Sequence, residues 1–108
     1  MIYSIDEIRE KVAPIAQKYE VKKIFIFGSY ARGEATENSD IDILFYSKGT
    51  KAKGLKTFGF ELELQDALGK KVEVFPKEDF ESEMYIKHNA KFIDNVLGDE
   101  VLLYEQAA

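Results

Sequence analysis

Phe27-Gly28-Ser29-Tyr30-Ala31-Arg32-Gly33-Glu34-Ala35-Thr36-Glu37-Asn38-Ser39-Asp40-Ile41-Asp42 is the stretch of sequence that decides the fold. The apolar run Ile24–Phe27 leads into it, and a second apolar run, Ile43–Phe45, follows it. Apolar runs bounded by glycine and polar residues are typical of strands and turns. We therefore predict a strand, a glycine turn, the start of a helix, a polar loop and a second strand.

Gly28 and Ser29 lie where the first strand ends. Because Gly28 has no side chain, a ligand can approach the backbone closely at that point. Backbone amides that follow at a helix start point outward and suit a phosphate group. The Gly28-Ser29 turn is therefore a candidate phosphate-binding site.

Asp40 and Asp42 are two residues apart. On an extended chain such side chains leave the backbone on the same face. Two adjacent carboxylates repel each other unless a cation lies between them, and carboxylate oxygens suit Mg²⁺. A phosphate site beside paired carboxylates indicates phosphoryl or nucleotidyl transfer.

Composition narrows the class of protein. The chain has 108 residues and a net charge of −5, so we expect a single domain over residues 1–108 that is a poor general binder of nucleic acid. No apolar run is long enough to cross a membrane, and the first residues do not resemble a signal peptide. With no cysteine, disulfides and thiolate metal sites are excluded. We expect a cytoplasmic protein.

The remaining elements follow from capping, periodicity and breakers. Ser4 and Glu7 form a capping-box pattern before a helix that we expect Pro14 to kink or divide. In the next helix we expect Phe58, Leu62 and Leu68 to face the core. The full set of predicted elements is four strands, Val21–Phe27, Ile41–Tyr46, Lys71–Phe75 and Val101–Tyr104, and two further helices, Phe58–Leu68 and Phe80–Leu97.

These elements predict an α/β fold in which helices cover mainly one face of a small mixed sheet and acidic residues lie on the other. Glu73, between Val72 and Val74, points away from them. Alone it is an ordinary polar residue on the outer face of a strand; beside Asp40 and Asp42 it becomes a candidate third carboxylate. His88, the only histidine, is expected to face solvent.

The lysine-rich segment 47–56 has two interpretations. We favour a solvated, mobile loop, because lysines in loops are usually just hydrated. The alternative is a cationic flap close to a triphosphate.

Gly28-Ser29-Tyr30-Ala31-Arg32-Gly33 followed by Ser39-Asp40-Ile41-Asp42 resembles the signature of the DNA polymerase beta-type nucleotidyltransferase superfamily. The short chain resembles its minimal nucleotidyltransferase (MNT) branch, whose members are often encoded beside a HEPN-domain protein as a toxin–antitoxin pair. The resemblance extends over most of the chain. Both parts of the signature together, at this spacing, rarely arise by chance.

The resemblance implies roles for individual residues. Gly28 and Ser29 would hold the β and γ phosphates of ATP, and Asp40 and Asp42 would bind two Mg²⁺ ions. Glu73 stands where the family usually carries an aspartate; it would help to bind the catalytic metal and deprotonate the attacking hydroxyl. Arg32 would meet phosphate, with a simple surface cation as its alternative interpretation.

Three functions are open at this stage. The first is Mg²⁺-dependent transfer of AMP from ATP to a hydroxyl of a HEPN-type ribonuclease toxin, which would make this chain the antitoxin. The second is nucleotidyl transfer to a small molecule, although relatives of that kind carry an additional acceptor-binding domain. The third is a non-catalytic antitoxin that neutralises its partner by contact.

Overall fold

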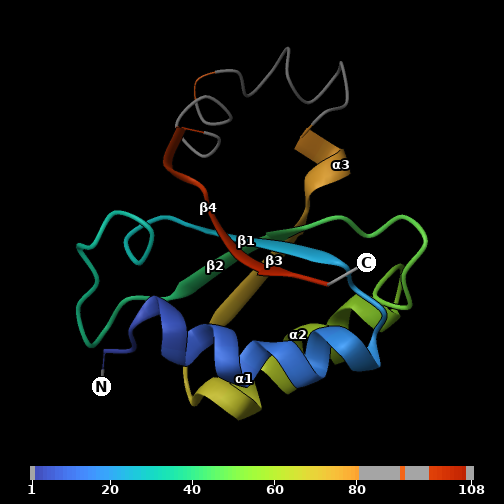
Figure 1. The fold of residues 1–108 in the computed structure, drawn as a ribbon, viewed down its shortest axis with the longest axis horizontal. Helices are drawn as coiled ribbons and strands as arrows, with labels where there is room; N and C mark the ends of the chain where they lie inside the picture. Colours follow the sequence, from blue (N-terminus) through green and yellow to red (C-terminus); the bar gives the residue numbers. More distant parts are fainter. Residues whose placement is uncertain (1, 81–90, 92–97, 107–108) are drawn as a thin grey trace.

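The computed structural model describes residues 2–80, 91 and 98–106. Within them a sheet with strand order β3-β2-β1-β4 is formed by β1 (Lys23–Phe27), β2 (Ile41–Phe45), β3 (Val72–Pro76) and β4 (Val101–Glu105). The helices whose bounds fall within the described residues are α1 (Ile5–Lys18), α2 (Lys56–Leu68) and the short α3 (Lys77–Phe80). α1 and α2 lie together on one side of the sheet, and α3 lies on the other (Figure 1). The predicted α/β fold, with helices mainly on one face, is confirmed.

α1 forms because its ends and its buried side are both well specified. The Ser4 hydroxyl accepts a hydrogen bond from the Glu7 amide, and the Glu7 carboxylate accepts one from the Ser4 amide, so the predicted capping box is present. Ile8, Val12 and Ala16 are buried at helical spacing. Pro14 lies inside one continuous helix, so the prediction of two helical pieces is wrong. Packing of this apolar stripe outweighs the single hydrogen bond that proline removes.

The sheet is mixed, as predicted. β1 pairs antiparallel with β2 and with β4, which makes it a central strand, whereas β2 and β3 run parallel. Parallel neighbours need a crossover connection, and α2 supplies it on the side of α1. The strand boundaries differ from the predicted ones by one or two residues, and the element after β3 begins at Lys77 rather than Phe80.

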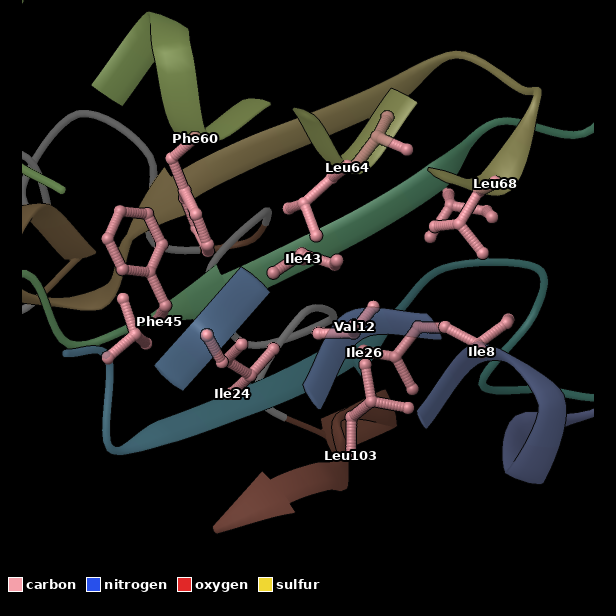
Figure 2. Close-up of a cluster of buried hydrophobic side chains, with 14 of the residues drawn as sticks. Ile8, Val12, Ile24, Ile26, Ile43, Phe45, Phe60, Leu64, Leu68 and Leu103 are labelled. Carbon is pink, nitrogen blue, oxygen red and sulfur yellow. The ribbon is translucent and has the colours of Figure 1, made fainter. Parts of the chain in front are cut away.

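The face of the sheet under α1 and α2, here called the helix face, carries the core. Strand residues of alternate positions, Ile24, Ile26 and Ile43 among them, meet Ile8 and Val12 of α1 (Figure 2). The side chains that α2 buries there are Phe60, Leu64 and Leu68. Burial of such side chains is the main stabilising term of a small domain.

The predicted core side of α2 was partly wrong. Leu68 is buried, but Phe58 is 64% exposed and Leu62 is 59% exposed. The helix has two apolar stripes, and Phe60 and Leu64 rather than Phe58 and Leu62 face the sheet. Gly69 ends the helix in the left-handed conformation, with a φ of +64°.

The opposite face of the sheet, here called the carboxylate face, has a smaller apolar cluster. Phe27 and Leu44 are buried there against Phe25 and Phe75. At its edge the Lys77 ammonium lies 4.0 Å from the centre of the Phe25 ring and 2.9 Å from a carboxylate oxygen of Glu100. These contacts connect β3 and α3 to the residues that lead into β4.

The segment 47–55 is not the purely solvated loop that the sequence favours. Glu78 accepts hydrogen bonds from the amides of Ser47 and Lys48, the Lys51 amide donates to the Tyr19 carbonyl, and Thr50 is buried. The segment follows the end of β2 that is farthest from Asp42, so it and residues 28–40 lie at opposite ends of the strands (Figure 1). The cationic-flap interpretation is therefore wrong.

Two predictions cannot be followed further. Almost all of the predicted helix Phe80–Leu97 lies outside the described residues. His88 also lies outside them. Among the helices that the structure describes, none is long and apolar enough to span a membrane.

Candidate active site

Asp42 and Glu73 lie side by side on the carboxylate face. They are register partners in the parallel pair β2–β3, about 4.8 Å apart along the hydrogen-bonding direction. On each strand the flanking residues, Ile41 and Ile43 on one and Val72 and Val74 on the other, belong to the core under the helices. Alternation therefore directs both carboxylates to the opposite side, as predicted for Glu73.

Gly28 lies directly beside this pair. Phe27 is the antiparallel partner of Asp42, so Gly28 follows at the end of β1 next to the Asp42 side chain. Its φ is +76°, and a Cβ atom at Gly28 would lie only 2.8 Å from Asp42 Oδ2. Glycine is thus required twice, for the backbone conformation and for the space that the Asp42 carboxylate occupies.

Residues 28–33 form a compact turn, and the predicted helix start after Gly28 is wrong. The Arg32 amide donates to the Gly28 carbonyl at 3.1 Å and the Glu34 amide donates to the Ser29 carbonyl at 2.9 Å. Gly33 then takes a φ of +72°, which ends the turn. One turn suffices because Gly33 breaks any helix that would continue.

The turn nevertheless leaves backbone donors available. Within the part of the chain that the structure describes, the amides of Ser29, Tyr30 and Ala31 have no acceptor. Successive amides without acceptors in a tight turn form a concave anion site. A phosphate group is an anion of suitable size for them, next to the carboxylates.

The Asp42 carboxyl shows the strongest electrostatic perturbation at the site. Burial, and then repulsion from Glu73 and Asp40, raise its pKa from 3.8 to about 6, while Lys71 and Arg32 oppose the increase. A raised pKa with these causes means that negative charge is crowded here without full compensation. Such crowding is common at functional sites.

Lys71 is a member of the site that sequence reasoning missed. Its ammonium lies 3.2 Å from Glu73 Oε1 and 4.0 Å from Asp40 Oδ2, and the hydrogen bond with Glu73 is the main cause of its raised pKa. The sequence carries a signal for it, because Lys71 precedes Glu73 by two residues and so leaves the strand on the same face.

Arg32 does not lie free beside the phosphate-binding turn. Its guanidinium pairs with Asp99 at 3.1 Å and Glu34 at 3.3 Å, and the hydrogen bonds to these carboxylates raise its pKa. A phosphate contact would have to replace at least one of these exposed pairs, which are worth little individually.

The donor chemistry at the site suits a divalent cation such as Mg²⁺, because the available groups are carboxylate oxygens with excess negative charge. Among the described residues, however, no three acidic or histidine side chains converge closely enough to form a metal site. The Lys71 ammonium holds Glu73 and Asp40 instead. The chemical type of these side chains suits a divalent cation, and Asp40, Asp42 and Glu73 are its candidate ligands.

An open hollow of about 470 Å³ lies beside Asp40. Asp40 and Lys71 form one side of it, and Tyr3, Leu68 and Gly69 contribute to the remainder. Asp42, Glu73, Gly28 and Ser29 are not among the residues that line it.

The comparisons with known proteins agree with this geometry. Residues 5–100 match the family model described as a nucleotidyltransferase domain, and the chain belongs to this family of nucleotidyltransferases. "Putative protein adenylyltransferase MJ0435" of Methanocaldococcus jannaschii is 47% identical over 72 residues, which are 66% of this chain and 75% of the relative. "Protein adenylyltransferase MntA" of Thermococcus cleftensis is 37% identical over 68 residues, 63% of this chain and 68% of the relative.

Solved structures support the same fold. One chain of a toxin–antitoxin crystal structure with AMP-PNP superposes with a TM-score of 0.67 at 21% identity, covering 91% of this chain and 73% of the other. A structure described as a putative minimal nucleotidyltransferase gives a TM-score of 0.61 at 24% identity, covering 92% and 95%. The resemblance to minimal nucleotidyltransferases that the signature predicts is confirmed.

Proposed function

We propose that this chain transfers AMP from ATP to a hydroxyl side chain of a partner protein, and that it thereby acts as the antitoxin of a HEPN-type ribonuclease toxin. The observation that carries the proposal is the placement of Asp42 between Glu73 and Gly28, with three amides that lack acceptors in the adjoining turn. Relatives named as protein adenylyltransferases support the reaction.

Each residue has a distinct part in the proposed reaction. The turn at Gly28 and Ser29 holds the β and γ phosphates through its amides. Asp40, Asp42 and Glu73 would hold Mg²⁺, which when bound neutralises the triphosphate charge. Glu73 accepts the proton of the attacking hydroxyl, whose oxygen bonds to the α-phosphorus. The bond from the α-phosphorus to the bridging oxygen breaks, and pyrophosphate leaves with that electron pair.

An AMP group on a serine or tyrosine of the partner adds bulk and negative charge. Close to a ribonuclease active site, such a group would hinder RNA binding. Two alternatives compete with this proposal: nucleotidyl transfer to a small molecule, and neutralisation of the partner by contact alone.

The test is transfer of label from ATP labelled at the α-phosphate to the product of the neighbouring gene, in the presence of Mg²⁺. The parent should label that protein, and the double variant Asp40→Asn/Asp42→Asn should not. ATP labelled at the γ-phosphate is the control, because its label should leave as pyrophosphate. If the double variant labels nothing yet still neutralises the partner in cells, as the parent does, the contact-only function replaces this one.

A further inference from the structure

The outward side of α2 has an apolar stripe that the active site does not use. Leu55, at the N-cap position, is 86% exposed, Phe58 is 64% exposed and Leu62 is 59% exposed. Their spacing aligns them along one side of the helix, opposite the buried residues Phe60 and Leu64. Beside Leu55 lies a hollow of about 560 Å³, lined by Tyr19, Gly59 and three lysines. An exposed apolar stripe of this kind marks a contact surface.

The charges around the stripe are arranged unusually for a helix. Lys53 and Lys56 lie at the N-terminal end of α2, where the helix dipole favours acidic groups, while Glu61 lies near its middle and Asp66 in its last turn. Glu63 is paired within the chain, 2.6 Å from the Lys18 ammonium of α1. α1, by contrast, has Asp6 and Glu7 in its first turn and Lys18 in its last, as the dipole favours. Lys56 in the first turn of α2 and Asp66 in its last turn are therefore both placed against the helix dipole in the isolated chain.

We infer that this stripe binds the same stripe of a second copy of the chain, with the two α2 helices antiparallel about a two-fold axis. If the axis passes between Phe58 and Gly59, each Leu55 lies opposite Leu62 of the second copy. Each Phe58 ring then lies at the level of Gly59 of the other helix, next to the Tyr19 hydroxyl, which would be 2.9 Å from a Cβ atom at Gly59. One apolar surface thus matches itself, as a two-fold interface requires.

The charges complement each other in the same arrangement. The basic end of each α2, with Lys53 and Lys56, lies along the part of the other helix that carries Glu61 and Asp66. A parallel pair would instead place lysine against lysine and carboxylate against carboxylate, which is unfavourable. The two helix dipoles are also antiparallel, so the reversed charge order of α2 favours association.

The dimer would leave both active sites open. α2 lies on the side of the sheet opposite Asp42 and Glu73 (Figure 1), so the second copy does not cover the carboxylates. One pair of short helices makes a small interface, and we expect a dimer whose Kd is on the order of 1–100 µM.

Sedimentation equilibrium of the full chain, from about 1 to 300 µM so that the expected Kd is bracketed, tests the inference. The parent should convert from monomer to dimer across this range. Leu62→Asp should weaken the dimer at least tenfold and keep the label transfer described above. Ile2→Asp is the matched control, because Ile2 is also half exposed but lies in a hollow with Tyr30 and Gly33, not on the stripe; it should dimerise as the parent does.

The direction of the helices can be tested separately because the chain has no cysteine. An oxidised mixture of Leu55→Cys and Leu62→Cys chains should form the mixed disulfide. Leu55→Cys alone should form none, since two Leu55 positions would lie about 10 Å apart along the axis. A parent that stays monomeric throughout, or a Leu55→Cys chain that links to itself as readily as to Leu62→Cys, overturns the inference. If Leu62→Asp leaves self-association unchanged and abolishes only binding of the neighbouring gene product, the stripe is a binding surface for that protein, and the inference is overturned.

Discussion

The two faces of the sheet use the same strands for opposite purposes. β2 directs Ile41, Ile43 and Phe45 into the completely buried core under α1 and α2. The same strand directs Asp42 to the carboxylate face, where Glu73 and Asp40 repel it. The helix face stabilises the fold, whereas the carboxylate face concentrates charge at the cost of stability. Substitutions on one face should therefore affect stability, and those on the other should affect chemistry.

The largest effect is expected from Glu73→Gln on the carboxylate face. It removes the proposed proton acceptor, so the rate of label transfer should fall by about 10²–10⁴-fold. The midpoint of thermal unfolding in the absence of metal should change little, because loss of the exposed Lys71–Glu73 ion pair is offset by removal of the repulsion between Glu73 and Asp42. A variant that unfolds at a much lower temperature than the parent would mean that Glu73 is a structural residue.

The counterpart on the helix face is Leu64→Ala. Leu64 is completely buried between α2 and the sheet (Figure 2), so its truncation should lower the free energy of unfolding by about 3 kcal/mol. Urea denaturation measures this loss. Label transfer per folded molecule should equal that of the parent at a temperature where the variant remains folded. A comparable loss of activity would show that the two faces are not independent.

Gly28 and Gly33, at the two ends of the phosphate-binding turn, refine the comparison of the two faces. Gly28→Ala and Gly33→Ala both place a side chain at a positive φ, which costs about 1 kcal/mol. A Cβ atom at Gly33 meets nothing within 4 Å, whereas one at Gly28 meets Asp42 Oδ2. Gly28→Ala should therefore lose about 1 kcal/mol more stability in denaturant titrations, and only Gly28→Ala should impair transfer strongly. If the two substitutions had equal effects, the proposed position of Asp42 beside the turn would be contradicted.

The smallest effect concerns Asp42 itself in the absence of metal. Its pKa is about 6 in the folded state and near 3.8 in the unfolded state, so the folded state binds more protons between these values. Stability should fall as the pH rises from about 4 to about 6 and stay lower above that range. Because the site is partly solvated, the loss is about 1 kcal/mol.

Asp42→Asn should abolish this pH dependence, and at pH 7.5 it should be as stable as the parent or more stable. Denaturation with urea at pH 4.5 and pH 7.5, in a chelator, measures both quantities. Addition of Mg²⁺ with ATP should then raise the unfolding midpoint of the parent and leave that of Asp42→Asn unchanged. A large loss of stability in Asp42→Asn without metal would contradict the proposed site.

Much of the site could be predicted because it depends on strand alternation. A period of two places Asp42 and Glu73 opposite their apolar neighbours whatever the details of the sheet. The glycine before the first loop likewise has a local reason that the sequence shows. The register between Asp42 and Glu73 could not be predicted, because α2 and its connections bring β3 alongside β2, and their geometry depends on packing.

The errors have equally physical causes. In α2 the residues Phe58 and Leu62 have the same helical spacing as Phe60 and Leu64. Periodicity identifies an apolar stripe but does not tell which of two stripes meets the sheet. The 47–55 segment was misjudged because its composition is that of a solvated loop, while its hydrogen bonds to Glu78 and Tyr19 come from residues distant in sequence. Tertiary contacts of this kind leave no local pattern.

The pairing of β4 with β1 has a consequence for how the protein folds. Lys23 and Glu105 are neighbours across that ladder, although about three quarters of the 108-residue chain separates them in sequence. Closing so long a loop is entropically slow, so β4 should join after the antiparallel pair β1–β2 has formed. Until then one edge of the apolar central strand is open to pairing with other chains. During synthesis on the ribosome, this edge is the point at which the protein is most exposed to aggregation.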